Sequence, residues 1–393
     1  MTDSSPQTMD AQWMDQALAL ASLGQCSTSP NPRVGCVLIK DGALIGSGWH
    51  QRAGGDHAEV MALKQAGSEA HGATAYITLE PCNHHGRTPP CSEALIEAGI
   101  KRAVVAIEDP DPRTAGTGIA RLRQAGIDVS VGVGESVAHE LNIGFIQRHQ
   151  TGRPWMRLKL AASLDGRATG PDGRSKWITS EPARADGHRW RAKACAVLTG
   201  INTVLADDPL LTARLNTSLE QPTDKPKDEP NDEPTERPVK QPIRVILDSH
   251  GRLPEHAKIF ESDAPVWVVS TVEMPDWFAA RASKDLQWHQ RPADLNGRVD
   301  LGSLMNWLGE KELNEVHVEA GPTLSGALLE NGWVDEVLIY QAPVFLGDGQ
   351  PMVNVPTIQA FDQRLRMHCV EVRQLGPDQF LRLRWHQHES TSH

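Results

Sequence analysis

The sequence contains few cysteines, no long apolar run and no concentrated positive charge. Its six cysteines are spread over 393 residues, which excludes a disulfide framework and favours a reducing compartment. No segment approaches the roughly 18–20 consecutive apolar residues that a membrane-spanning helix needs, and the start, MTDSSPQTMD, lacks the pattern of a secretory signal. The net charge of −11 argues against an extended nucleic-acid surface, while leaving room for a local basic pocket that binds a small anion. We therefore expect a soluble cytoplasmic protein with no membrane or nucleic-acid partner.

The length of 393 residues exceeds one ordinary hydrophobic core, so we expect two domains. In residues 1–151, a hairpin turning at Asp41-Gly42 is followed by alternating strands and helices, with helices that end at glycine. This alternation predicts a layered α/β domain with largely parallel pairing. A helix over 135–150 leads to the predicted boundary at 151–154. The strands predicted for a second α/β domain, residues 152–393, lie at 155–166, 195–200, 243–248, 266–270, 315–321 and 335–344.

Residues 216–242 differ in composition from the rest of the second domain. Proline recurs there at positions 222, 226, 230, 234, 238 and 242 among charges of both signs. Such a segment buries too little apolar surface to offset the entropy that it would lose on ordering. We interpret it as a solvated surface loop inserted into the second domain rather than as a binding motif.

The stretch TLEPCNHHGRTPPC contains two cysteines, Cys82 and Cys91, that could bind zinc. A catalytic zinc site usually has three protein ligands and a water, so a third ligand is needed. His84 and His85 lie between the cysteines, but a closed cage within so short a loop is awkward. The alternative is His57, which lies upstream in HAEV.

The pair His57 and Glu59 also has the residue types of a hydrolytic site. Zinc lowers the pKa of a bound water to about 7, and a carboxylate that is not a ligand can carry the proton of that water to a leaving amine. The pattern therefore indicates hydrolytic deamination of an amidine-like carbon. A purely structural zinc would instead need a fourth protein ligand and no carboxylate. The remaining cysteines are interpreted as small, partly buried apolar residues: Cys26, Cys36, Cys195 and Cys369.

The second domain lacks the G-x-G-x-x-G fingerprint of the common dinucleotide fold. Another phosphate cradle is present in EVHVEAGPTLSGALLENG, residues 315–332, where a predicted strand runs directly into a helix. Backbone N–H groups at the helix start can bind a pyrophosphate, with Gly321 and Gly326 allowing close approach. Glycine at such a turn can equally serve packing alone.

Zinc nucleobase deaminases commonly carry H-x-E followed by P-C-x-x-C, whereas eight residues separate the cysteines here. With this spacing, and with NPRVGCVL, HAEV, LEPCNHHGRTPPC and AIEDPDP in order, the first domain resembles the bifunctional deaminase/reductases of riboflavin biosynthesis. The resemblance implies three zinc ligands, His57, Cys82 and Cys91. It makes Glu59 the proton donor and acceptor. It implies contacts to the base, ribose or phosphate of the substrate by Asn31, His50, His84 and Arg87, while His85 is expected to be an exposed loop residue.

The chain from about Pro154 to about Leu383 resembles the reductase half of the same family, in LKLAASLDGR, SKWITS, GINTVLADDPLLTAR, RVILDSHGRLP and VEAGPTLSGALL. The implied fold is a cytidine-deaminase-like three-layer α/β/α domain followed by a dihydrofolate-reductase-like α/β domain. The implied NADPH contacts are Ala161, Trp177, Thr203, Asp207, Ser249, Gly321, Pro322, Thr323, Leu324, Ser325, Gly326 and Ala327. The implied substrate contacts are Ser175, Arg191, Leu211, Arg214 and Glu319.

Some of these residue types suit their implied roles, and others have two interpretations. Arg191 and Arg214 suit a bidentate hold on a ribose phosphate, because the guanidinium presents paired donors. Lys159 and Asp165 either position the substrate or belong to the fold. Trp177 is either a cofactor contact or a core aromatic residue.

The resemblance implies two consecutive reactions on a phosphorylated pyrimidine. The first is zinc-dependent hydrolytic deamination of 2,5-diamino-6-(5-phosphoribosylamino)pyrimidin-4-one. The second is NADPH-dependent reduction of the ribosyl chain of 5-amino-6-(5-phosphoribosylamino)uracil to a ribityl chain. A homo-oligomer, dimer or tetramer, is also expected.

Two alternatives belong to other functional classes. A nucleic-acid base deaminase with a C-terminal binding domain would share the zinc chemistry, but the acidic charge disfavours it. An active deaminase could instead carry a structural C-terminal domain. The preference for NADPH over NADH stays open, because the contacts to the 2′-phosphate around Ser249 and Arg252 are undefined by the sequence.

Overall fold

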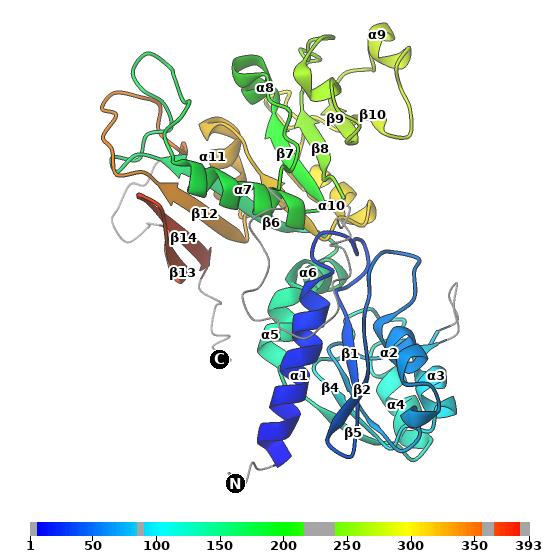
Figure 1. Cartoon of the computed structure of the whole chain (residues 1–393). Coiled ribbons are helices and arrows are strands. Elements are labelled where there is room, and N and C mark those ends of the chain that lie inside the picture. The colour runs from blue at the N-terminus through cyan, green and yellow to red at the C-terminus, as the bar shows by residue number, and fades with distance from the viewer. Residues whose placement is uncertain (1–5, 85–89, 216–239, 356–364, 386–393) are drawn as a thin grey trace, which may run out of the picture. The chain divides into compact units, whose positions relative to one another are not determined.

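The computed structural model describes residues 6–84, 90–215, 240–355 and 365–385, which form two compact units that meet in sequence between Arg153 and Pro154. Figure 1 labels their helices and strands. Each unit has its own sheet and its own hydrophobic core. Within the described ranges, no helix has the length and apolar character needed to cross a membrane.

Unit 1 contains a five-stranded mixed sheet in the order β2-β1-β3-β4-β5. Its strands are β1 (Gly35–Lys40), β2 (Ala43–Trp49), β3 (Thr74–Ile77), β4 (Arg102–Val105) and β5 (Asp128–Val131). The predicted hairpin is confirmed, with both turn residues, Asp41 and Gly42, at positive φ. The predicted pairing holds only for β3, β4 and β5, since β1 is antiparallel to both neighbours. The hairpin places β2 at the edge of the sheet. The chain that follows β2 then returns across the sheet, and β3 pairs with the other side of β1.

Helices cover both faces of this sheet, giving three layers (Figure 1). The helices are α1 (Pro6–Ser22), α2 (Ala58–Ala66), α3 (Cys91–Glu97), α4 (Thr117–Gln124), α5 (Glu135–Leu141) and α6 (Ile143–Thr151), with a 3₁₀ turn η1 (Gly67–Ala70). Alternate residues of β1 face opposite layers: Cys36 and Leu38 pack with α2, α3 and α4, whereas Val37 and Ile39 pack with α1, α5 and α6. This is the alternation expected of a strand that is covered on both sides.

The helix predicted over 135–150 is divided at Asn142. The Asn142 side chain accepts a hydrogen bond from Arg33 N at 2.8 Å and donates one to Arg33 O at 2.9 Å. The backbone at Asn142 leaves the helical range, with φ −112° and ψ 19°, and α6 starts at the next residue. An asparagine amide that satisfies a distant backbone pair thus ends one helix and begins another.

Unit 2 contains a nine-stranded sheet in the order β10-β9-β8-β7-β11-β6-β12-β14-β13. The strands are β6 (Trp155–Ala162), β7 (Ala196–Gly200), β8 (Ile243–Leu247), β9 (Val266–Ser270), β10 (Leu286–Gln290), β11 (Glu315–Val318), β12 (Glu336–Gln341), β13 (Met367–Leu375) and β14 (Asp378–Trp385). Pairing is parallel from β10 to β12 and antiparallel for β14 and β13. The strand β10 and the β13–β14 hairpin were not predicted from the sequence, because their polar and charged residues mask the apolar pattern.

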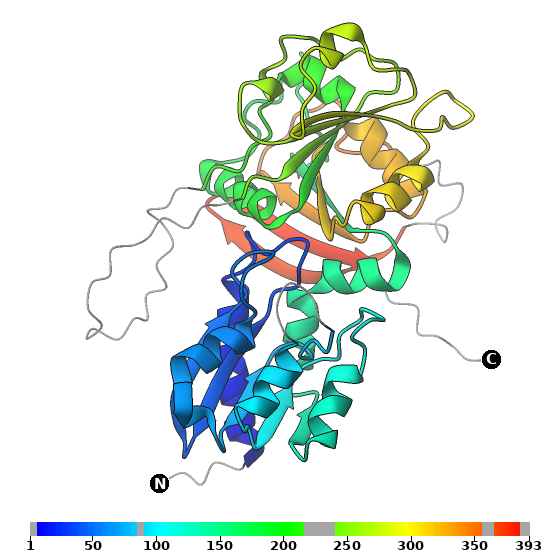
Figure 2. The same cartoon turned by 90° about the vertical axis from the view of Figure 1, so that its right-hand side faces the viewer.

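The helices of unit 2 also lie on both faces of its sheet. They are α7 (Glu181–Lys193), α8 (Ile201–Asp207), α9 (Asp276–Ala279), α10 (Leu301–Glu310) and α11 (Pro322–Glu330), with a 3₁₀ turn η3 (Lys258–Phe260). Figure 2 shows α10 and α11 on one side of the sheet and α7, in green, on the other. The core under α10 and α11 continues across the central strands, while α8 and α9 pack on the opposite face of β8 and β9.

A buried ion network joins β14 to the centre of the unit 2 sheet. Glu336 of β12 is fully buried and accepts from Arg157 of β6, from Arg382 at 2.6 Å and from Arg384 at 2.8 Å. Arg157 also donates to Glu315 at 3.1 Å. The charged residues that obscured β14 in the sequence are therefore its interior contacts in the fold.

Candidate functional site

Three metal-binding side chains of unit 1 converge where β3 ends and two helices begin. His57 is the residue before α2, Cys82 follows β3, and Cys91 is the first residue of α3. Their ligand atoms all lie within 4.8 Å of one another. The Nδ1 atom of His57 is 3.2 Å from the Cys91 sulfur and 3.6 Å from the Cys82 sulfur. Two sulfurs and one imidazole nitrogen are a donor set that suits zinc.

Within the described ranges this group has three members, and no fourth histidine, cysteine or carboxylate joins it. Three protein ligands with an open position characterise a catalytic zinc site rather than a structural one. Hydrogen bonds from Cys91 and then His57 lower the pKa of the Cys82 thiol below its ordinary value despite burial. The cluster therefore favours a thiolate at Cys82, the form that binds metal, whereas the hydrogen bond with Cys82 and burial raise the pKa of the Cys91 thiol.

Glu59 lies in the first turn of α2, beside this cluster but outside the ligand set. Its side chain is 3% exposed, and burial raises the pKa of the Glu59 carboxyl to about 7. The side chain is within hydrogen-bonding reach of Cys91. A carboxyl group with these properties can take up and release a proton near neutral pH.

Asn31 and His50 lie next to the cluster, but His50 does not present a free ring nitrogen. The Nε2 atom of His50 is 3.0 Å from the Asn31 side-chain nitrogen, and its Nδ1 atom is 3.0 Å from the Asp56 carbonyl oxygen. Since the carbonyl only accepts, Nδ1 donates and Nε2 accepts from Asn31. The ring is 3% exposed and packs edge-on to His57. His50 therefore orients Asn31, and its expected contact with the substrate stays a prediction.

The remaining expected contacts of this unit are in the segment between the two cysteines. His84 is exposed, and its Nδ1 atom is 3.4 Å from Thr114 Oγ1. Its nitrogens are outside the metal cluster. Arg87 and His85 lie outside the described residues, as does most of the proline-rich segment 216–242.

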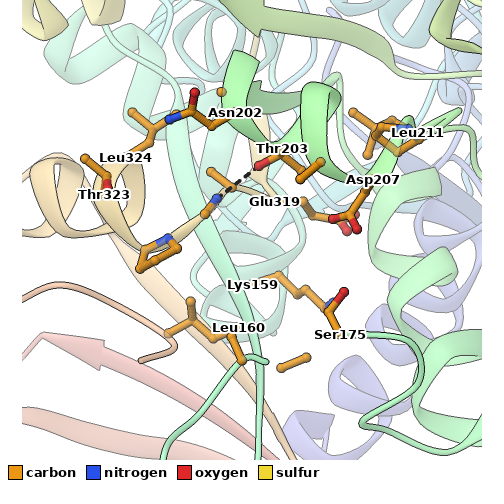
Figure 3. A pocket seen from close by; sticks show the side chains of 18 of the residues that line it. Lys159, Leu160, Ser175, Asn202, Thr203, Asp207, Leu211, Glu319, Thr323 and Leu324 are labelled. Carbon is orange, nitrogen blue, oxygen red and sulfur yellow. Dashed lines mark hydrogen bonds between the residues drawn. The ribbon is translucent and has the colours of Figure 1, made fainter. Parts of the chain in front are cut away.

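Unit 2 contains a large cavity at the carboxyl ends of its parallel strands, with a volume of about 1860 Å³. Open α/β sheets bind ligands at this edge. Residues after β8 and β11 line it together with parts of α7, α8 and α11. Figure 3 shows the side chains contributed by α8, by α11 and by the end of β11. The expected contact residues that line it are Ala161, Ser175, Trp177, Arg191, Thr203, Asp207, Leu211, Arg214, Ser249, Glu319, Gly321, Pro322, Thr323, Leu324 and Ala327.

Ser325 and Gly326, both expected to contact a cofactor, turn away from this cavity. The Ser325 hydroxyl is fully buried and donates to the Ala320 carbonyl at 3.2 Å. A Cβ atom at Gly326 would lie 1.8 Å from the carbonyl oxygen of Asn354. Glycine is needed at 326 because another part of the backbone passes there. This favours the packing interpretation of Gly326, and its expected contact with the cofactor stays a prediction.

Gly321 differs from Gly326, because it faces the cavity at the predicted start of α11. Its N–H donates to Thr203 Oγ1 at 3.2 Å, drawn as a dashed line in Figure 3. A Cβ atom there would meet only Thr203 Oγ1, at 3.8 Å. The turn from β11 into α11 thus leaves space beside its backbone for a phosphate group, while the Gly321 N–H itself is engaged by Thr203.

Arg191 and Glu319 were both expected to contact the substrate, and the structure pairs them with each other. Arg191 Nη2 donates to Glu319 Oε2 at 2.8 Å, Arg191 Nε donates to Oε1, and Arg191 Nη1 donates to the Thr212 carbonyl at 3.1 Å. The paired donors that would hold a phosphate are therefore already engaged. Arg214 is exposed, with one contact from Nη2 to His188 at 3.1 Å, and is the better placed of the two for an anion.

The structure distinguishes between the two interpretations that were given for Asp165 and for Trp177. Asp165 accepts from Ser163 Oγ at 2.5 Å, Leu346 N at 3.1 Å and Gly347 N at 2.8 Å, so its carboxylate anchors a loop of the fold. Trp177 is 69% exposed at the cavity, which excludes the core interpretation.

Lys159 also lines the cavity, together with Tyr340 and His188, which were not predicted from the sequence. Burial lowers the pKa of Lys159, although Glu319 opposes the shift. Tyr340, whose hydroxyl donates to Asp186 at 2.7 Å, lies near Lys159. His188 belongs to α7. This helix is rich in charged residues, and its apolar face is too narrow to give a recognisable pattern in the sequence.

Comparison with known proteins gives the two units separate matches. Residues 154–381 match the RibD C-terminal domain, and residues 7–107 match the cytidine and deoxycytidylate deaminase zinc-binding region. The riboflavin biosynthesis protein RibD of Escherichia coli K12 is 46% identical over 376 residues, covering 95% of this chain and 99% of that protein. A structure of Acinetobacter baumannii RibD, form 1, has a TM-score of 0.85 at 44% identity and covers 97% of this chain and 100% of that chain.

A third relative is described by its activities. The structure of a diaminohydroxyphosphoribosylaminopyrimidine deaminase/5-amino-6-(5-phosphoribosylamino)uracil reductase from Thermotoga maritima has a TM-score of 0.83 at 32% identity. It covers 97% of this chain and 99% of that chain.

The fold and the sites define a zinc-binding deaminase joined to a reductase on one polypeptide. The chain belongs to the RibD family of riboflavin biosynthesis enzymes. The expected fold class, with a cytidine-deaminase-like unit followed by a dihydrofolate-reductase-like unit, is confirmed, as are the expected deaminase and reductase classes of enzyme.

Proposed function

We propose that unit 1 deaminates 2,5-diamino-6-(5-phosphoribosylamino)pyrimidin-4-one and that unit 2 then reduces the ribosyl chain of 5-amino-6-(5-phosphoribosylamino)uracil with NADPH. The observation that carries the proposal is the three-ligand cluster with a separate carboxyl group beside it, in a chain of this family. The substrates in this proposal are those for which the Thermotoga maritima relative is named. The large cavity of unit 2 has room for a dinucleotide and a second ligand together.

In the deaminase unit, His57, Cys82 and Cys91 would hold zinc, and Glu59 would move the proton. Zinc bound there supplies a water that is acidic enough to act as a nucleophile at neutral pH. Glu59 takes a proton from the attacking water and delivers it to the departing amine, which its raised pKa and its burial support. Asn31, held by His50, and His84 and Arg87, from the segment between the cysteines, would orient the substrate.

In the reductase unit, backbone groups at the start of α11 would hold the pyrophosphate of NADPH, and Arg214 would hold the ribose phosphate of the substrate. The other cavity residues named above would complete the two contact sets. Arg191 would act by fixing the Glu319 carboxylate, which can accept hydrogen bonds from the substrate. The protein's contribution is orientation, since hydride transfer is the chemistry of the cofactor.

We also propose that the protein works in the cytoplasm as a homo-oligomer, with no nucleic-acid partner. Among the described residues, Cys36, Cys82, Cys91 and Cys369 are thiols outside any disulfide, which suits a reducing compartment.

A coupled assay tests the function. Zinc-loaded protein should release ammonia from the diaminopyrimidinone ribotide without any nicotinamide cofactor, and should then oxidise NADPH faster than NADH. Failure to bind or oxidise NADPH would favour a structural C-terminal unit. Salt-sensitive binding of single-stranded RNA or DNA would favour the nucleic-acid alternative.

A further inference from the structure

Glu80 is a buried carboxylate close to the metal cluster. The proposed chemistry assigns it no role. It is 3% exposed and lies two residues before Cys82. Its Oε2 atom accepts from Asp109 N at 3.1 Å and Gly116 N at 2.9 Å, and its Oε1 atom accepts from Gly118 N at 2.9 Å and Ile119 N at 3.1 Å. Because a carboxylate accepts about four hydrogen bonds, these backbone groups use its whole capacity.

The residues bound by Glu80 belong to one folded segment, residues 108–119. Within it, Asp109 Oδ1 accepts from Asp111 N at 2.9 Å, and the Asp111 carbonyl accepts from Thr114 N at 2.8 Å. At its end the segment lies directly on the chain next to Cys82, because a Cβ atom at Gly118 would be 2.0 Å from the Pro81 carbonyl oxygen. The segment therefore packs against the chain just before Cys82, a metal-binding residue. Glu80 lies in that part of the chain and accepts the hydrogen bonds that hold the segment there.

The same segment reaches the residue expected to face the substrate. Thr114 Oγ1 is 3.4 Å from His84 Nδ1, and His84 lies between the two cysteines. Thr114 is 1% exposed, so its position follows that of the segment.

We propose that Glu80 is a positioning residue of the deaminase. It holds the 108–119 segment against the chain before Cys82, and through Thr114 this segment sets where His84 meets the substrate. The inference rests on the proposed function of unit 1. None of the four hydrogen bonds of Glu80 involves His57, Cys82, Cys91 or Glu59, so the chemical step and the metal do not depend on it directly.

The variant Glu80→Gln tests this role, because an amide offers one acceptor oxygen and turns an NH₂ group toward backbone donors. A loosened segment misplaces His84, and misplacement of a substrate contact lowers the efficiency of an enzyme severely. We expect KM for the diaminopyrimidinone ribotide to rise on the order of tenfold, with kcat little changed. Zinc content and reductase turnover of unit 2, assayed with the deaminated intermediate supplied directly, should equal those of the unsubstituted protein.

Two further variants make the test specific. Glu108→Gln applies the same chemical change to an exposed residue of the same segment and should leave KM unchanged. Thr114→Val removes the contact to His84 and should raise KM, and its effect should not add to that of Glu80→Gln, since both act through one segment.

An unchanged KM in Glu80→Gln, a loss of zinc, or additive effects of the two variants would overturn the positioning role. Absence of ammonia release by the unsubstituted protein would refute the proposed function instead, so the two failures are distinguishable.

Discussion

Arg191 and Glu319 form a two-point ion pair in the wall of the unit 2 cavity, with Arg191 Nη2 2.8 Å from Glu319 Oε2. The two side chains are 15% and 14% exposed. The pair comes from α7 and the end of β11, 128 residues apart in the chain. It therefore joins a surface helix to the central sheet at the point where ligands are expected to bind.

Glu319→Gln should weaken unit 2 and its activity together. It leaves the Arg191 guanidinium largely buried without its counter-charge, and removing one partner of a buried pair typically costs about 3–5 kcal/mol in the free energy of unfolding. Calorimetry should show a lower unfolding temperature for unit 2, and reductase turnover should fall while ammonia release persists. Arg214→Ala, an exposed change in the same cavity, should weaken the reductase with a stability change within about 0.5 kcal/mol. Equal stability of the two variants would contradict this reading.

The stability of unit 2 should also depend on Glu319 at low pH. Burial raises the pKa of Glu319, but Arg191 and His317 outweigh it and hold this pKa well below the ordinary carboxyl value. The pair therefore contributes fully above about pH 4.3, the ordinary value for the unfolded chain, and the contribution is lost as pH falls toward the folded pKa. Calorimetric scans from about pH 6 to about pH 3 should show a steeper loss of stability in the unsubstituted protein than in Glu319→Gln. Parallel curves would exclude this carboxyl group as a source of the acid sensitivity.

Glu59→Gln should abolish deamination while leaving zinc in place. The amide keeps the size of the side chain but cannot carry a proton, and loss of a general acid–base group lowers turnover by about 10²–10⁴-fold. Metal analysis and ammonia release measure the two effects, and the reductase step on supplied intermediate is the internal control. Retained deaminase turnover would remove Glu59 from the proton-transfer role.

Cys91→Ser should lose zinc, whereas His84→Ala should retain it. The Cys91 sulfur belongs to the three-atom cluster, and the His84 ring contacts Thr114 instead. Metal content per chain after dialysis distinguishes the two variants. Zinc loss in His84→Ala would place this histidine among the ligands.

Two glycines of the same motif should respond differently to alanine. Gly326→Ala drives a methyl group into the Asn354 carbonyl, and overpacking of this kind costs about 1–3 kcal/mol or more in the free energy of unfolding. Gly321→Ala has space and an ordinary φ of −66°, so unit 2 should stay folded. Its methyl group, placed at the open turn before α11, should raise KM for NADPH. A stable Gly326→Ala would show that the segment around Asn354 moves readily.

The sequence was most informative where the site residues lie close together in short motifs. His57 and Glu59 are two residues apart, and Cys82 and Cys91 are nine positions apart. The cluster could therefore be predicted once the order of the neighbouring strands and helices was known. The start of α11 after Gly321 was predictable for the same reason.

Contacts between distant segments could not be predicted in this way. The pairing of Arg191 with Glu319 depends on where α7 packs, and the engagement of both His50 ring nitrogens depends on how two loops meet. Gly326 illustrates a different limit, because a motif does not say whether a ligand or the chain itself occupies the space beside a glycine. The β14 strand escaped prediction because its arginines face a buried glutamate rather than solvent.

The place of β14 in the sheet has a consequence for synthesis on the ribosome. Unit 1 pairs strands that lie close together in the chain, so it can fold while the rest is still being translated. In unit 2, β14 is inserted between β12 and β13, and Arg382 and Arg384 arrive last to neutralise Glu336. Until residue 384 has left the exit tunnel, Arg157 remains as the nearest partner of that carboxylate in the unfinished sheet. The sheet of unit 2 is thus completed only after residue 384 has been synthesised, when unit 1 has had time to form.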